Sequence, residues 1–200
     1  MAIDLQKINI KFYLAEKAVL SPKEAFRIFS QWIPLTTDEI LIDVADYQHV
    51  ARGPKTVLVG HGANYTYDNS DGRYGLLYGS KIGTQGSNAA RLRAAFAASL
   101  KACVRLQQAE DAATKPHFVG SEAVITINDR LHAANSEATL AQIRADLESV
   151  LDELYAGAPT QIEREGDARQ RFTVRVRAEG NFEMVDLLAN LSASDARTVV

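Results

Sequence analysis

Short segments that alternate between apolar and polar residues constrain the fold more than any other feature of this sequence. In Ile8–Leu14 and Arg171–Ala178 the even-numbered residues are apolar, and the odd-numbered ones are mostly polar or charged. A period of two is typical of a strand with only one buried face. Such strands need a layer that covers that face, and the helical segments between them can supply it. Strands are predicted over residues 8–14, 39–45, 55–60, 74–78, 123–128, 160–165 and 171–178.

Amphipathic segments between these strands predict four helices. The first begins with Ser21-Pro22-Lys23-Glu24, in which Ser21 and Glu24 form a capping box, and it is expected to end at Pro34. Ser136 is expected to cap the third helix, which closes near Gly157. The remaining helices are predicted over about 88–107 and 182–191.

The order of these elements predicts an α+β fold built from two tandem halves. Each half is expected to run strand–helix–strand–strand–helix, with a mainly antiparallel sheet covered by helices. The N-terminal half spans 1–110 and contains a Gly/Tyr-rich segment at 43–86, and the C-terminal half spans 117–200. The polar stretch Glu110–Pro116 separates them. We expect the two halves to pack as one unit.

Charge and cysteine content narrow the class of protein. Residues 1–109 carry 13 Lys or Arg and 9 Asp or Glu, a balance of +4, whereas residues 110–200 carry 9 and 16, a balance of −7. Such halves attract each other, within one chain or in a homodimer, and the pattern does not predict nucleic-acid binding. No apolar run is long enough for a membrane span, and a single cysteine cannot form an internal disulfide. A cytoplasmic protein is therefore expected.

The segment 43–86 differs in composition from the rest of the chain. It holds 8 of the 12 glycines, 5 of the 7 tyrosines and 2 of the 4 histidines. Glycine lets a backbone approach a ligand closely, and tyrosine offers a flat apolar ring with a hydroxyl group. We expect six residues near strand ends to converge on one solvent-accessible depression that binds a ligand: Asp46, His49, His61, Tyr65, Arg73 and Tyr78. The alternative is that the tyrosines are strand residues and that the glycines simply form turns.

Three motifs of this segment resemble a family of bacterial proteins of about this length that has no assigned function. They are Asp-Val-Ala-Asp-Tyr-x-His-Val from Asp43, Gly-His-x-x-x-Tyr from Gly60 and Gly-Arg-x-Gly-Leu-Leu-Tyr from Gly72. The resemblance implies a cytoplasmic bacterial protein, and it supplies no catalytic residue.

Two further groups of residues are candidates for binding charged partners. Lys81, Ser87 and Arg91 flank the start of the long helix and are candidates for anion binding, although Ser87 can equally be a simple helix cap. Arg171, Arg175 and Arg177 share one strand face. They are expected to pair with acids of the neighbouring strand, Glu165 lying opposite Arg171, rather than to bind an acidic partner.

These observations leave two classes of function open. The first, which we favour, is a non-catalytic module that binds a small molecule or a protein in a polar groove lined by Tyr and His. The second is a small-substrate enzyme that uses Asp46, His49, His61 and Arg73, with metal assistance as a variant. Because the sequence has no paired metal-binding motif, no metal site and no cofactor are predicted.

Overall fold

A single antiparallel sheet of eight strands forms the centre of the protein. The computed structural model describes residues 3–83, 85–110 and 112–197, with side chains to residue 193. The strand order in the sheet is β2-β3-β4-β5-β1-β6-β8-β7. The strands are β1 (Ile8–Leu14), β2 (Leu41–Asp46), β3 (Pro54–Gly60), β4 (Ala63–Asp68), β5 (Gly75–Ser80), β6 (Phe118–Ile127), β7 (Thr160–Glu165) and β8 (Phe172–Ala178).

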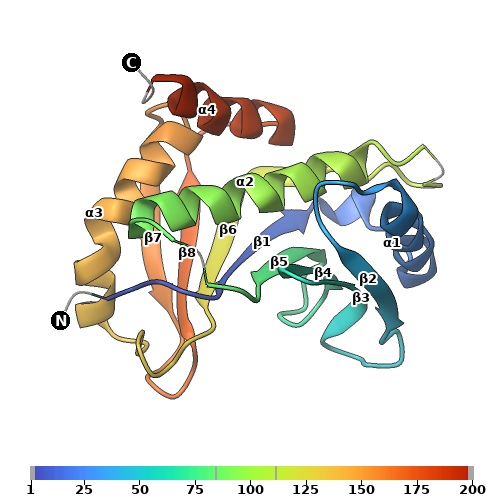
Figure 1. Ribbon diagram of the computed structural model, residues 1–200, viewed down its shortest axis with the longest axis horizontal. Coiled ribbons are helices and arrows are strands. Elements are labelled where there is room, and N and C mark those ends of the chain that lie inside the picture. Colours follow the sequence, from blue (N-terminus) through green and yellow to red (C-terminus); the bar gives the residue numbers. More distant parts are fainter. Residues whose placement is uncertain (1–2, 84, 111, 198–200) are drawn as a thin grey trace.

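The helices of the described residues pack on one face of this sheet (Figure 1). The longest, α2, crosses the middle of the sheet and contacts β1 and β5, whereas α1 lies over β2 and β3. A short 3-10 helix, η1 (Glu16–Ala18), follows β1. The α-helices are α1 (Pro22–Leu35), α2 (Asn88–Gln107), α3 (Glu137–Leu154) and α4 (Met184–Arg197).

Serine caps fix where three of these helices begin. Ser21 and Glu24 form the expected capping box, with the Ser21 backbone amide donating to the Glu24 carboxylate at 3.0 Å. The hydroxyl of Ser87 accepts from the Ala90 amide, and the hydroxyl of Ser136 accepts from the Thr139 amide. Each cap satisfies a backbone donor that the first turn leaves unpaired, which explains why the predicted starts are confirmed.

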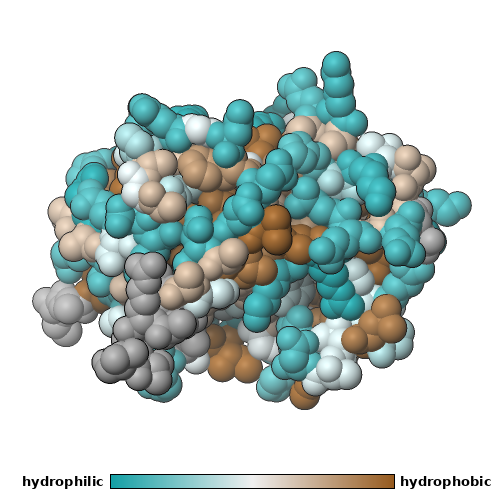
Figure 2. All heavy atoms as spheres, turned by 90° about the horizontal axis from the view of Figure 1, so that it is seen from above, coloured by the Kyte–Doolittle hydropathy of each residue, from teal (hydrophilic) through white to brown (hydrophobic). Residues whose placement is uncertain are grey.

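The core lies between the sheet and the helices. The even-numbered residues of β1 are buried there, and Phe12 meets Phe96 of α2 edge to face at 6.3 Å between ring centroids. The predicted stripe of α3, from Leu140 to Leu154, is buried against the same layer. Seen from the helix side, the surface is mostly hydrophilic, with small hydrophobic areas between the charged side chains (Figure 2). This is the expected pattern for helices with only one face toward a core.

The α+β class and the antiparallel sheet are confirmed, but the order of elements differs in the first half. The second half runs β6-α3-β7-β8-α4, as expected, whereas the first half has four strands between α1 and α2. Strand β4 falls in a stretch that the sequence analysis left without an element. Helix α4 begins two residues later than predicted and continues to Arg197.

One continuous sheet runs through both halves. β1 of the first half pairs with β6 of the second, with Ile10 opposite Ile125, and α2 contacts both α3 and α4. Backbone pairing and helix packing therefore join residues 1–110 to residues 117–200, while their status as separate domains stays a prediction.

Cleaving the linker should leave the two fragments bound to each other. We expect a protease site inserted between Thr114 and Lys115 to be cut under native conditions, and the fragments to co-elute in size-exclusion chromatography at both low and high salt, because β1 remains paired with β6. Fragments that separate at low salt would contradict this expectation.

Large-to-small substitutions in the core should be costly. Leu147 and Phe96 are 1% and 0% exposed. Leu147→Ala should lower the free energy of unfolding by about 2–5 kcal/mol and Phe96→Ala by about 3–5 kcal/mol, since each leaves a cavity. Leu131, 87% exposed, is the control, and Leu131→Ala should change it by less than about 0.5 kcal/mol. Urea unfolding monitored by circular dichroism measures all three.

Candidate functional site

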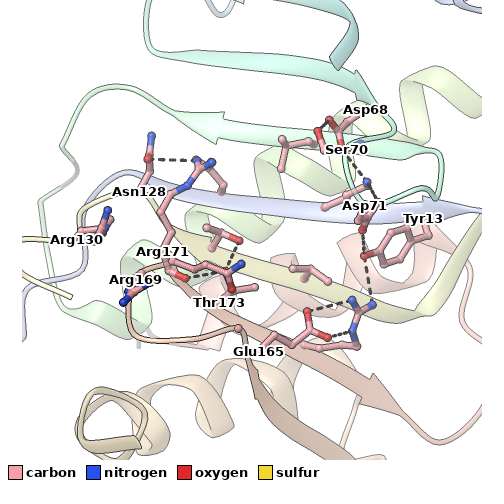
Figure 3. Close-up of a pocket in the computed structure, with 18 residues that line it drawn as sticks. Tyr13, Asp68, Ser70, Asp71, Asn128, Arg130, Glu165, Arg169, Arg171 and Thr173 are labelled. Atoms are coloured by element: carbon pink, nitrogen blue, oxygen red, sulfur yellow. Dashed lines mark hydrogen bonds and ion pairs between the residues drawn. The ribbon is translucent and has the colours of Figure 1, made fainter. Parts of the chain in front are cut away.

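A groove of about 880 Å³ lies on the sheet face opposite the helices (Figure 3). Its floor is formed by outward-facing residues of the central strands, among them Asn9, Leu77, Val124, Thr126 and Thr173. The β4–β5 turn closes one end, and the β7–β8 turn with the loop after β6 forms the other. Five Lys or Arg and three Asp or Glu line it. Antiparallel sheets commonly bury one face and leave the other in contact with solvent, so a ligand can reach this groove without any movement of the helices.

Lys11 anchors the end formed by the β4–β5 turn. It points away from the helices, yet only 4% of the residue is exposed, because the turn folds over it. Its ammonium group donates to Asp68 and Asp71, both at 2.7 Å, and to the carbonyl of Arg73 at 2.9 Å. These partners use all three ammonium donors and compensate the buried charge.

Tyr13 lies next to Lys11 on β1 and is completely buried, although it faces the groove. Its hydroxyl donates to Asp71 at 2.5 Å and accepts from Arg175 at 3.2 Å. The guanidinium of Arg73 covers the ring at 3.7 Å from its centroid. Burial, with the hydrogen bond to Asp71, raises the pKa of Tyr13 far above its usual range, so the phenol remains protonated.

Arg175 of β8 links this cluster to the strands of the second half. It donates to Glu165 through two nitrogens, at 2.5 and 3.1 Å, and to Glu122 at 2.5 Å. Arg73 pairs with the same Glu122 at 3.0 Å. Burial alone would lower the pKa of Arg175, but the bonds to the two carboxylates outweigh it and raise that pKa.

Two carboxyl groups of this cluster are held ionised. Burial alone would raise the pKa of Asp71 and of Glu122. The hydrogen bonds from Lys11 and Tyr13 to Asp71, and from Arg73 and Arg175 to Glu122, outweigh burial and lower both pKa values. The cations at this end of the groove are therefore already paired within the protein.

The backbone of the β7–β8 turn, at the opposite end of the groove, is fixed by hydrogen bonds from Asn135 and Arg164. Asn135 is 2% exposed, and its amide donates to the carbonyls of Glu165 and Asp167 at 2.7 and 3.1 Å. Arg164 donates to the Asn135 side chain at 3.1 Å and to the carbonyl of Gly166 at 2.9 Å. Gly166 has φ of 78°, which a residue with a side chain adopts only with strain. The turn therefore presents its remaining side chains from a fixed backbone.

Three arginines line this end without an acidic partner among the described residues, and their side chains point in different directions (Figure 3). Arg130 comes from the loop after β6, and Arg169 and Arg171 from the β7–β8 turn (Figure 3). None of the three forms an ion pair with a described residue, and Arg171 makes only a long hydrogen bond, 3.4 Å, to the side chain of Asn128. The two ends of the groove thus differ, because the cations are paired at one and unpaired at the other.

The six predicted ligand residues do not line one depression. Asp46 and His49 are exposed at one end of β3, where the backbone amide of Tyr47 bonds to Lys55. His61 is exposed just beyond the other end, after Gly60. A strand of seven residues separates the histidines by roughly 20 Å. The expected convergence is therefore corrected, and binding by individual residues of the set stays a prediction.

The other three residues of that set serve packing and pairing. Tyr65 lies under α1, where its ring meets Trp32 and Tyr78 and its hydroxyl donates to Glu39 at 3.0 Å. It faces the helices, on the side away from the groove. Of the six predicted residues, Arg73 comes nearest to the groove, because its ion pair with Glu122 holds it at the edge of the groove.

The three anion candidates at the start of α2 have partners within the protein. The ammonium of Lys81 donates to the carbonyl of Gly60 at 2.7 Å, Ser87 caps the helix, and Arg91 is buried against Asp4. Ser87 is therefore a helix cap, which was the alternative interpretation. Arg91 joins the N-terminal segment to α2 through its ion pair with Asp4. Anion binding by this group stays a prediction.

The pairing of the β8 arginines differs from expectation by two residues. Glu165 lies opposite Thr173 and Glu163 opposite Arg175, so the expected match of Glu165 with Arg171 is wrong. Arg175 and Arg177 do pair with acids, as predicted, but Arg171 extends beyond the last acidic residue of β7. The register therefore leaves Arg171 unpaired at the groove.

Sequence reasoning missed Lys11, Tyr13, Arg130 and Arg169 as site residues. One signal was present, because Lys11 and Tyr13 occupy the outward positions of an alternating central strand. Nothing in the sequence showed that β1 would lie beside β6 and so bring these residues near the β7–β8 turn.

Neither models of known protein families nor curated proteins match this chain. Among the described residues, no three His, Cys, Asp or Glu side chains lie close enough together to hold a metal ion. No helix within residues 3–83, 85–110 and 112–197 has the length and apolar character of a membrane span.

Replacing Asp71, one carboxylate of the Lys11 cluster, should make the free energy of unfolding depend less on pH in the acidic range. Because the folded pKa of Asp71 lies below its unfolded value, its ionised form stabilises the fold at neutral pH, and this contribution is lost as the pH falls through the folded pKa. Asp71→Asn should therefore lower the free energy of unfolding at pH 7, and the difference from wild type should shrink towards about pH 3.

Urea titrations at several pH values measure this difference. Glu179→Gln, an exposed position after β8, is the control and should change little at any pH. An Asp71→Asn deficit that is equally large at pH 3 and pH 7 would show that lost shape, not lost charge, causes the destabilisation.

Proposed function

We propose that this protein is a non-catalytic module that binds a small molecule in the groove on the helix-free face of its sheet. The observation that carries the proposal is the groove itself. Its volume of about 880 Å³ falls within the usual range for small-molecule sites, roughly 300–1,000 Å³. Its floor carries polar side chains, such as Asn9 and Thr126, and the apolar side chains of Leu77 and Val124, which suits a ligand with both hydrogen-bonding and carbon surfaces.

The chemistry of the lining favours binding over catalysis. The residues that line the groove include no histidine and no cysteine. Ser70 donates to Asp68 at 2.5 Å, but Lys11 already compensates the charge of that carboxylate, so it is poorly placed to activate the hydroxyl. The tyrosine hydroxyl of Tyr13 is held protonated within its hydrogen bonds. These groups hold the shape of the site.

The path of the chain through the sheet supports the same location. In each half the first strand lies at the centre of the sheet, the chain crosses by a helix to the sheet edge, and it returns strand by strand to the neighbour of that first strand. We propose that the halves are two versions of one strand–helix–strand–strand–helix unit, the first carrying two extra strands. The groove then lies at their junction, with Lys11 contributed by one half and Arg175 by the other.

Blocking the groove floor should abolish ligand binding. Thr126 lies half-buried in the middle of the floor beside Thr173, with 3.2 Å between their hydroxyl oxygens. Thr126→Gln places a longer side chain in the groove. Native mass spectrometry should detect a small-molecule adduct on wild type, either as purified or after incubation with the dialysable fraction of a bacterial lysate, and should not detect it on the variant.

The matched control is Val59→Gln, on the same sheet face but outside the groove. It should retain the adduct. An adduct that survives Thr126→Gln, or a wild type that acquires none from the lysate fraction, would refute the proposed site. Thermal unfolding of each variant confirms that it is folded.

A further inference from the structure

The charges in the groove are paired at one end and unpaired at the other. Lys11, Arg73 and Arg175 each contact carboxylates, so a ligand gains little from displacing them. Arg130 and Arg169 form no ion pair with any described residue, and both are exposed. The unpaired positive charge is therefore concentrated where the β7–β8 turn meets the loop after β6 (Figure 3).

The acids nearest to the arginines in sequence are occupied elsewhere. Asp129 accepts from the ring of His132 at 2.9 Å, and Asp167 accepts from the backbone amide of Arg169 at 2.7 Å. An isolated bridge between Ala134 and Arg171 joins the two segments that carry the arginines. With the turn also fixed by Asn135, little backbone ordering would remain to oppose ligand binding.

The number and type of these cations indicate the group they would bind. A guanidinium presents paired N–H donors in a plane that match two oxygens of a carboxylate or a phosphate. A carboxylate has two oxygens and one charge, which a single arginine satisfies. A terminal phosphate has three acceptor oxygens and close to two charges near pH 7, so it needs more than one guanidinium group, and the exposed arginine side chains at this end can turn toward it.

The rest of the groove limits what the phosphate is attached to. The groove offers a nucleotide base no aromatic ring to stack on, because Tyr13, the one aromatic residue of the lining, is 0% exposed beneath Arg73. The arginines that could stack on a base are here assigned to the phosphate. The floor instead offers the amide of Asn9 and the hydroxyls of Thr126 and Thr173. These groups can form hydrogen bonds with hydroxyl groups on the part of the ligand that carries the phosphate.

We propose that Arg130, Arg169 and Arg171 bind the phosphate group of a small phosphorylated polyol, such as a sugar phosphate, whose hydroxyl-bearing body lies along the floor of the groove. The inference rests on the proposed function, since it names the ligand class of that same groove.

Calorimetric titration with four probes tests this assignment. Ribose 5-phosphate and inorganic phosphate should bind wild type, with ribose 5-phosphate the tighter of the two. Ribose should bind far more weakly than ribose 5-phosphate, and AMP should bind no more tightly than ribose 5-phosphate. Arg171→Gln should weaken ribose 5-phosphate binding about tenfold or more, since it removes charge-assisted hydrogen bonds.

Arg144→Gln is the matched control, because Arg144 is an exposed arginine on α3, far from the groove, and pairs only with the exposed Glu148. It should leave the affinity unchanged, whereas Arg169→Gln should weaken it as Arg171→Gln does. Arg171 and Arg169 are exposed and unpaired, so their variants should unfold at the wild-type temperature.

Several outcomes would overturn the inference. They are equal affinity for ribose and ribose 5-phosphate, wild-type affinity in Arg171→Gln, and tighter binding of AMP or of a short oligonucleotide than of ribose 5-phosphate. If the lysate adduct still binds Arg171→Gln but not Thr126→Gln, the groove binds a ligand of another class, so the proposed function stands and only the phosphate assignment fails. If wild type acquires no adduct from the lysate and also fails to bind ribose 5-phosphate, both proposals are refuted.

Discussion

Lys11 lies on the central strand of the sheet, with its ammonium group buried, and a charge in that position must be compensated inside the protein. The compensation comes from Asp68 and Asp71, which requires the β4–β5 turn to fold over the open face of β1. That fold in turn brings Arg73 onto the ring of Tyr13 and against Glu122 of β6. The shape of one end of the groove thus follows from a single buried cation. Removing either partner of such a pair costs more than the pair contributes, so the arrangement specifies one structure rather than merely adding stability.

The same cluster joins the two halves of the chain through side chains, in addition to the backbone pairing of β1 with β6. Tyr13 belongs to the first half and Arg175 to the second, and they share a hydrogen bond at 3.2 Å. Glu122 accepts from arginines of both halves. Opposite net charges of the halves agree with this geometry, but the attraction is local. It acts through a few half-buried groups at the junction, where screening by salt is weaker than at the surface.

Much of the fold was predictable because local chemistry determines it. β1 was predicted with its exact bounds, since its alternation is unbroken, and the start of α2 follows from the Ser87 cap. β4 was missed because glycines and tyrosines suggested a binding loop, whereas Tyr65 and Tyr67 are core residues whose hydroxyls bond to Glu39 and to the carbonyl of Leu20. The groove could not be predicted, because it depends on pairing between strands about a hundred residues apart and on a register that differs by two residues from the expected one.

These outcomes suggest which features of a sheet with one covered face carry information about ligands. Composition alone was misleading, because residues of the Tyr/Gly-rich segment are required by the fold. Tyr65 packs under α1, and Gly75 lies so close to the backbone of Phe12 that a Cβ would sit 2.3 Å from the carbonyl oxygen. Charge pairing discriminates better. The fold accounts for Lys11 and Arg175, because removing either cation would leave the buried Asp68 or the largely buried Glu122 with one partner fewer. It does not account for Arg130, Arg169 and Arg171, which line one end of the groove, the last two beside a turn whose backbone is bonded to the buried Asn135. Cations that the fold does not neutralise, beside a turn whose backbone is fixed from behind, are therefore the feature on which the proposed ligand class depends.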